Sequence, residues 1–243
     1  MHTSALILSL FAAMAFVSAK PHGVKTYSSC KKPGTFALTF DDGPYKYSWD
    51  LAEYLHKEGI RATFFTNGLN AVDVLHDKIK TKDGKKTYLE LLQHHVDMGH
   101  EVGSHTYEHK DLEGLSEDKV AEQLDKQSDI IHKAIGKRPR LFRPPEGVYD
   151  AVAEKLLKER GYVNVLWDVD TKDWKLKGLK YSQDRVMKAL HKKDAKRNGH
   201  ICLEHDIHKP TVEELIPWLI KYVRDQGYEF VPISECIGEE PYQ

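Results

Sequence analysis

The chain has 243 residues, of which 40% are hydrophobic and 30% are charged. This composition is typical of a folded globular protein and excludes a fibrous or disordered chain. Lysine and arginine total 36 against 37 aspartate and glutamate residues, so the formal net charge is −1. Because no excess of positive charge is present to attract a polyanion, we expect no nucleic-acid partner.

The N-terminus carries the only long apolar run of the sequence. Residues 5–17 contain no charge, are too few to cross a membrane, and lead into Val17-Ser18-Ala19, which resembles a signal-peptidase site. We therefore interpret residues 1–19 as a secretory signal and residues 20–243 as one mature domain. We expect a secreted protein, extracellular or in the cell wall, that is free of the membrane after signal removal and monomeric.

Three cysteines cannot all pair within one chain. Cys30 and Cys236 flank the presumed folded body, whereas Cys202 lies between Ile201 and Leu203 and is typical of a buried small hydrophobe. Because exported proteins form disulfides, we expect a Cys30–Cys236 disulfide and a free Cys202.

Short segments rich in β-branched and aromatic residues alternate along the chain with segments of helical periodicity. The first kind predicts strands at residues 35–40, 62–66, 101–105, 140–143, 162–168, 200–204 and 228–233. Apolar residues at spacings of three and four, such as Leu51 and Leu55, predict helices between them. The alternation favours one domain of βα units, with a parallel sheet that is either closed as a barrel or open and doubly wound.

Residues typical of helix ends support this alternation. Ser116 precedes and Gly136 follows one predicted helix, and Thr211 with Glu214 predicts a capping box at the start of another. We interpret the lysine-rich segment 78–86 as a solvated loop.

Polar side chains recur where the predicted strands end, which is where parallel α/β folds place their reactive groups. These residues are Asp41, Asp42, His105, His109, Arg143, Asp170, Asp173, His205 and Asp206. In a closed sheet they would all converge on one mouth.

Two of these groups have the chemistry of a metal site. His105 and His109 follow a predicted strand, and a single turn there would place both imidazoles on one side. Two imidazoles and a carboxylate form a ligand set that zinc accepts while leaving a position open. Asp41 and Asp42 point in different directions if the chain is extended, so that one can bind the ion while the other takes a proton from the attacking water. The pattern leaves open which aspartate takes which role.

Five segments, in this order, resemble the motifs of the polysaccharide deacetylase family, carbohydrate esterase family 4, which shares the NodB-homology domain. They are residues 39–44 (TFDDGP), 105–109 (HTYEH), 143–147 (RPPEG), 170–174 (DTKDW) and 203–206 (LEHD). The likeness extends over nearly the whole mature chain. It implies an α/β fold, a distorted, incomplete (β/α) barrel of about seven parallel strands in a single domain.

The resemblance also implies a role for individual residues. Three would hold a divalent metal ion, zinc in the first place and cobalt as an alternative: Asp42, His105 and His109. Asp41 would be the general base and His205 the general acid. Arg143 would orient Asp41, and Asp173 would support His205.

The implied activity is metal-dependent removal of N-acetyl groups from a cell-wall polysaccharide. Trp174 and Leu203 would line the groove for the sugar and its acetyl methyl, and Glu146 stands where the family usually has an aromatic residue. The segment Leu166–Asp170 looks more like fungal chitin deacetylases, so we expect N-acetylglucosamine polymer, chitin or its oligomers, as substrate. The alternatives are peptidoglycan, acetylxylan, a catalytically silent glycan-binding member, and a metal-dependent phosphoesterase.

Overall fold

The computed structural model describes residues 23–190 and 195–243, so the predicted secretory signal at residues 1–19 lies outside the described residues. None of the helices in these two ranges combines the length and apolar character needed to cross a membrane.

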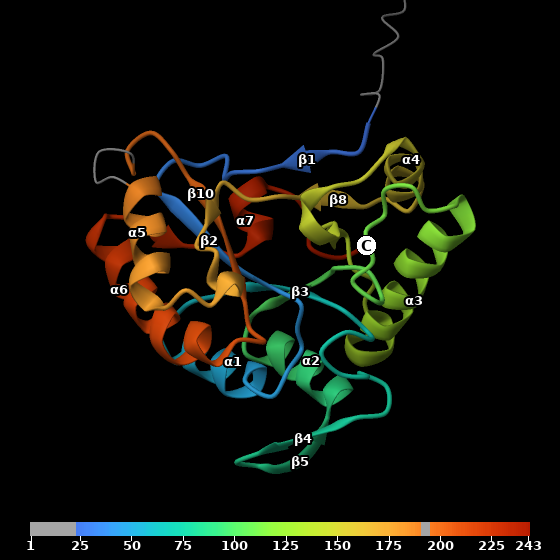
Figure 1. Ribbon diagram of the computed structural model, residues 1–243, viewed down its shortest axis with the longest axis horizontal. Coiled ribbons are helices and arrows are strands. Elements are labelled where there is room, and N and C mark those ends of the chain that lie inside the picture. Colours follow the sequence, from blue (N-terminus) through green and yellow to red (C-terminus); the bar gives the residue numbers. More distant parts are fainter. Residues whose placement is uncertain (1–22, 191–194) are drawn as a thin grey trace, which may run out of the picture.

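A curved sheet of nine parallel strands forms the centre of the described part of the chain (Figure 1). The strands are β1 (Thr26–Tyr27), β2 (Thr35–Asp41), β3 (Thr63–Thr66), β6 (Glu101–Ser104), β7 (Leu141–Phe142), β8 (Val163–Val165), β9 (Val169–Asp170), β10 (His200–His205) and β11 (Glu229–Phe230). Their order is β1-β8-β7-β6-β3-β2-β10-β9, and β11 pairs with the start of β2. The result is an open, incomplete (β/α) barrel, as predicted.

Helices surround the sheet (Figure 1). They are α1 (Ser48–Lys57), α2 (Tyr88–Asp97), α3 (Glu117–Ile135), α4 (Ala151–Glu159), α5 (Leu179–Ala189), α6 (Ile216–Asp225) and α7 (Ile233–Ile237), with short helical turns at Pro145–Gly147, Asp173–Lys175 and Thr211–Leu215. The helix predicted between Ser116 and Gly136 is confirmed as α3, and Gly136 ends it in the left-handed conformation with φ 70°. Glycine adopts that conformation without the steric cost of a side chain.

The central strand β2 is buried over its whole length, and its two faces serve two parts of the core. Phe36, Leu38 and Phe40 pack outward with residues of α1 and α6. Ala37 points into the barrel and packs with α7, which fills the end of the barrel where the strands begin. Because that end is filled with apolar side chains, the opposite end, where the strands finish, is left for a site.

The predicted Cys30–Cys236 disulfide is present, and Cys202 is free and buried. The bridge joins the segment before β2 to helix α7 across 206 positions of sequence. In the chain-entropy model, closing a loop of that size stabilises the folded state by about 5 kcal/mol. The disulfide therefore secures the filled end of the barrel.

The prediction of a loop at residues 78–86 was wrong. These residues form an antiparallel hairpin of β4 (Lys78–Thr81) and β5 (Gly84–Thr87). Gly84 turns the chain with φ 102°, and Ile79 is 4% exposed because it packs with the side chains of α2. The two strands of the hairpin contain a single apolar residue, Ile79, among their lysines, so the sequence shows too little alternation to predict them.

The predicted capping box of Thr211 and Glu214 was also wrong. The backbone at Thr211–Leu215 forms a π-helical turn that no side chain caps. The Thr211 hydroxyl instead donates a hydrogen bond to Asp173 Oδ2 at 2.8 Å. The side chain therefore serves a tertiary contact rather than the start of its own helix.

The predicted strand at residues 162–168 is interrupted. It corresponds to β8 (Val163–Val165), after which the chain leaves the sheet and returns as β9 (Val169–Asp170) beside β10. The interruption allows Trp167 to face the open end of the barrel.

Candidate functional site

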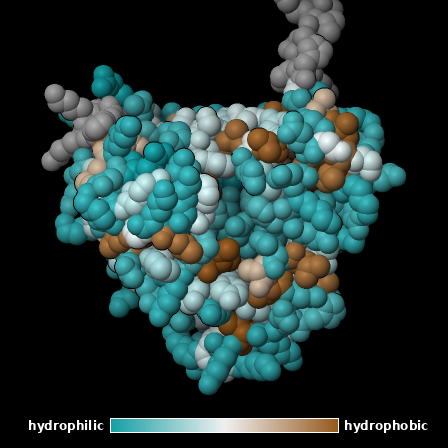
Figure 2. All heavy atoms as spheres, in the orientation of Figure 1, coloured by the Kyte–Doolittle hydropathy of each residue, from teal (hydrophilic) through white to brown (hydrophobic). Residues whose placement is uncertain are grey.

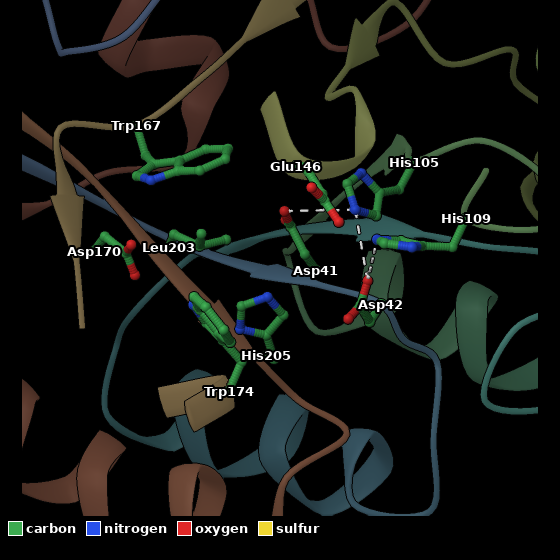
Figure 3. A pocket seen from close by; sticks show the side chains of 10 residues that line it. All are labelled: Asp41, Asp42, His105, His109, Glu146, Trp167, Asp170, Trp174, Leu203 and His205. Carbon is green, nitrogen blue, oxygen red and sulfur yellow. Dashed lines mark ion pairs between the residues drawn. The ribbon is translucent and has the colours of Figure 1, made fainter. Parts of the chain in front are cut away.

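A cavity of about 440 Å³ opens at the end of the barrel where the strands finish. Figure 3 shows its lining side chains, which are Asp41, Asp42, His105, His109, Glu146, Trp167, Asp170, Trp174, Leu203 and His205. Eight of the ten residues predicted from the sequence as site residues are in this set. The other two, Arg143 and Asp173, lie buried directly behind it and contact Asp41 and His205.

Asp42, His105 and His109 converge on one point. One ligand atom from each residue lies within 4.8 Å of the others. Asp42 Oδ1 is 3.1 Å from His109 Nε2 and 3.5 Å from His105 Nε2 (Figure 3). Asp42 comes directly after β2, where a left-handed φ of 72° turns its side chain toward the histidines.

Two observations test whether these three residues fit a metal ion. Asp42 Oδ1 is buried and makes no hydrogen bond, which leaves it free for an ion. His105 Nδ1 donates a hydrogen bond to the Arg143 carbonyl at 2.7 Å, so that Nε2 carries the lone pair and faces Asp42. Burial raises the pKa of Asp42, but the two imidazoles lower it by more, and the net pKa lies below its ordinary value. The set therefore fits a divalent cation.

Asp41 is held differently from its neighbour. Arg143 is fully buried, and its Nη1 donates hydrogen bonds to Asp41 Oδ1 at 2.7 Å and to Thr39 Oγ1 at 2.8 Å. The same guanidinium donates through Nε to the Val165 carbonyl and lies 4.3 Å above the Phe65 ring. These contacts fix the position of the guanidinium, and the guanidinium in turn fixes the orientation of the Asp41 carboxylate.

The other carboxylate oxygen of Asp41 faces the histidines. Asp41 Oδ2 lies 3.7 Å from His105 Nε2. With one oxygen bonded to Arg143 and the other directed at the cavity, Asp41 can accept a proton from a molecule bound next to the metal ligands.

His205 ends β10, where it is the partner of Asp41 in the neighbouring strand β2, and it is bound to Asp173. Its Nδ1 donates a hydrogen bond to Asp173 Oδ1 at 2.8 Å, and its backbone N–H donates to Asp173 Oδ2 at 2.9 Å. The Thr211 hydroxyl donates a further hydrogen bond to the same carboxylate. Burial lowers the pKa of His205, but the hydrogen bond and charge of Asp173 outweigh burial and raise it to about 10. His205 is therefore a protonated imidazolium at neutral pH.

The walls of the cavity combine indole rings, one aliphatic side chain and two carboxylates. Trp174 is 47% exposed, whereas Leu203 is 4% exposed at the base. The molecular face in Figure 2 is mostly hydrophilic, with hydrophobic residues in small patches around its centre and upper edge. Aromatic rings beside polar groups suit a ligand with both apolar faces and hydroxyl groups, such as a sugar.

Glu146 lies on the wall in a left-handed conformation with φ 55° and is exposed. The next residue, Gly147, has φ 78°, and a Cβ on it would come within 3.1 Å of the Trp167 ring. Glycine is therefore required there for the turn and for the close approach of Trp167.

Trp167 and Asp170 are cavity residues to which the sequence analysis gave no role. Trp167 was placed within a continuous strand, and only the interruption between β8 and β9 turns it toward the cavity. Asp170 was noted as a polar residue after a strand, which was the available signal. Its Oδ1 accepts a hydrogen bond from the Lys172 N–H at 2.8 Å.

Asp206 was expected at the same mouth but does not line the cavity. It is buried and accepts a hydrogen bond from the Ser48 hydroxyl at the start of α1. Burial raises the pKa of Asp206 to about 7. It supports the backbone beneath the site rather than facing it.

Removing the charge of Asp173 tests the coupling to His205. In Asp173→Asn we expect the pKa of His205 in the metal-free protein to fall far below about 10, because burial then acts without the opposing carboxylate. The raised pKa of His205 stabilises the fold at pH values that lie below about 10, and the lowered pKa of Asp173 means that the same pair stops stabilising the fold in acid, where Asp173 is protonated. The variant should therefore lose stability most near neutral pH. NMR titration of the imidazole measures the pKa.

Asp170→Asn is the matched control, because Asp170 lines the cavity without contacting His205, and it should shift the His205 pKa much less. An unchanged pKa in Asp173→Asn would refute the coupling.

The chain is similar to known proteins in sequence and in fold. The family model described as polysaccharide deacetylase matches residues 28–165. A chitin deacetylase of Colletotrichum lindemuthianum is 33% identical over 87% of this chain and 83% of its own length. The solved structure of the chitin deacetylase from that fungus has a TM-score of 0.82 and 31% identity, covering 90% of this chain and 95% of that chain.

Two longer relatives are matched over part of their length. A chitin deacetylase of Arthroderma benhamiae is 33% identical over 87% of this chain, which spans 54% of that protein. Peptidoglycan-N-acetylglucosamine deacetylase PgdA of Listeria monocytogenes is 33% identical over 84% of this chain, which spans 39% of that protein. The chain is thus similar to deacetylases of two different glycans.

Proposed function

The chain belongs to the polysaccharide deacetylase family, and we propose that it removes N-acetyl groups from N-acetylglucosamine polymer, chitin or chitin oligomers, releasing acetate and leaving glucosamine units. The observation that carries the proposal is that a three-residue metal-ligand set, Asp41 and His205 line one cavity. Likeness to the chitin deacetylase of Colletotrichum supports the choice of polymer.

Asp42, His105 and His109 would hold the metal, with zinc as the proposed ion because two imidazoles and a carboxylate that leave a position open are typical of catalytic zinc. Cobalt is the alternative. When bound, such an ion polarises the acetamide carbonyl and lowers the pKa of water.

The chain's own residues carry the proton transfers. Asp41 would accept a proton from the attacking water through Oδ2, because Arg143 occupies Oδ1. His205 would donate a proton to the departing nitrogen, since an amine is a poor leaving group until it is protonated. Its raised pKa keeps that proton available at neutral pH. We assign Arg143 and Asp173 the roles of orienting Asp41 and His205.

The cavity walls would bind the sugar. Trp174 and Leu203 would contact the ring and the acetyl methyl, and the backbone N–H of Glu146 would donate to the developing oxyanion. Glu146 places a carboxylate where the family usually has an aromatic residue. This negative charge favours a glycan in which neighbouring sugars carry positive charge, such as partly deacetylated chitin.

We place this reaction outside the cell, on cell-wall polysaccharide, with the protein acting as a monomer. The Cys30–Cys236 disulfide supports an oxidising compartment.

Peptidoglycan and acetylxylan are the alternative substrates, since the same residues would attack acetyl groups on either. A silent binding protein has no need of Asp41 and His205, each with its own buried partner. A phosphoesterase would place several cationic side chains around phosphate, but among the described residues that line the cavity there is no lysine or arginine.

Acetate release tests the function. We expect kcat/KM on chitin oligomers to exceed that on peptidoglycan fragments and acetylxylan by at least tenfold, about 1.4 kcal/mol in transition-state binding. Chelation should abolish the activity, and zinc or cobalt should restore it. A tenfold preference for either other polymer would refute the substrate, and full activity after exhaustive chelation would refute metal dependence.

Variants of a proposed metal ligand and of the proposed base should separate metal binding from turnover. His109→Ala should lower the zinc content of the purified protein, whereas Asp41→Asn should retain zinc and lose at least ~10²-fold in kcat because it removes only the base. Zinc analysis and acetate release on the same samples measure both effects. Asp111→Asn, an exposed aspartate two positions beyond His109, is the control and should change neither. Loss of zinc from Asp41→Asn would reverse the assignment of base and ligand.

A further inference from the structure

The three residues that converge on the metal position come from two separate loops. Asp42 follows β2, and His105 and His109 follow β6, with β3 lying between these two strands in the sheet. The site therefore exists only if the two loops are held together across the end of β3.

Both loops contain residues whose backbone conformation is unfavourable on its own. Asp42, Thr106 and His109 all have left-handed φ values, of 72°, 67° and 54°. For the β-branched Thr106 this conformation is a true outlier. Such conformations persist only where the surrounding structure imposes them.

One buried residue at the end of β3 bonds to both loops, to one through its side chain and to the other through its backbone. Asn67 is 2% exposed, and its Nδ2 donates hydrogen bonds to the carbonyls of His105 at 2.5 Å and Thr106 at 2.9 Å. Its backbone N–H donates to the carbonyl of Gly43, next to Asp42, at 2.8 Å. These three bonds connect the end of β3 to the Asp42 loop on one side and the His105–His109 loop on the other.

A second asparagine completes the connection. Asn70 Nδ2 donates to Asn67 Oδ1 at 3.3 Å and to the Asp42 carbonyl at 3.5 Å. The Asn67 amide therefore has both its ends engaged, with two donors on carbonyls and its oxygen accepting. A carboxylate in its place would oppose two carbonyl oxygens, and an apolar side chain would leave them buried without a donor.

We propose that Asn67 is a positioning residue for the metal site, which holds the Asp42 loop against the His105–His109 loop and thereby sets the affinity for the ion. The inference rests on the proposed assignment of Asp42, His105 and His109 as metal ligands. Outer-shell groups that fix the orientation of metal ligands contribute substantially to metal affinity, and Asn67 would do so through the backbone that carries the ligands.

Zinc binding, measured by competition with a chromogenic chelator in the absence of glycan, tests the proposal. We expect Asn67→Asp and Asn67→Ala to weaken zinc binding by about 10- to 100-fold. The matched control is Thr63→Val at the other end of β3, which removes buried hydrogen bonds to Glu101 and Ile233. It should lower the Tm of the metal-free protein while leaving the zinc Kd within about twofold.

Wild-type zinc affinity in folded Asn67 variants, or an equal loss in Thr63→Val, would overturn the proposal, because the side chain would then act on stability alone. If the Asn67 variants do not fold, the exposed Asn70→Ala decides. It should weaken zinc binding a few-fold, and an unchanged affinity overturns the inference. His109→Ala tests the ligand assignment separately from the role of Asn67. Unchanged zinc binding in this variant would refute the ligand assignment itself.

Discussion

The buried ion pair between Arg143 and Asp41 is the interaction on which the rest of the site depends. A guanidinium with no exposed surface is stable only where its donors are satisfied, and Asp41, Thr39 and backbone carbonyls satisfy them. The pair engages one carboxylate oxygen of Asp41 and leaves the other directed at His105. Asp42 is turned by its left-handed backbone toward the histidines, so two identical side chains acquire different chemistry.

A second buried pair, that of His205 and Asp173, lies beside the first, because His205 and Asp41 are partners in neighbouring strands. Asp173 holds His205 and raises its pKa to about 10, whereas Arg143 holds Asp41 with one oxygen directed at the metal ligands. The proposed proton acceptor and proton donor thus face the same cavity from the ends of two neighbouring strands, β2 and β10. Both rest on a barrel whose other end is filled by α7 and tied by the disulfide.

The alternation of strand and helix patterns was enough to predict the βα architecture and the end of the sheet at which polar residues meet. The motif resemblance implied roles that periodicity alone left open, such as which aspartate would bind the ion. Features that depend on tertiary contacts were not predictable. Thr211 donates to Asp173 rather than capping its helix, and Asn67 bonds to residues 38 and 39 positions away. A two-residue strand such as β1 has no periodicity to detect.

X-ray diffraction from crystals of the zinc-loaded protein, recorded at the zinc absorption edge, tests most directly the claim that the two aspartates are divided between ion and proton. The account predicts one anomalous peak about 2.0–2.2 Å from an Asp42 oxygen and from Nε2 of His105 and His109, with Asp41 still bonded to Arg143. A peak coordinated by Asp41, or zinc bound away from these three residues, would contradict it.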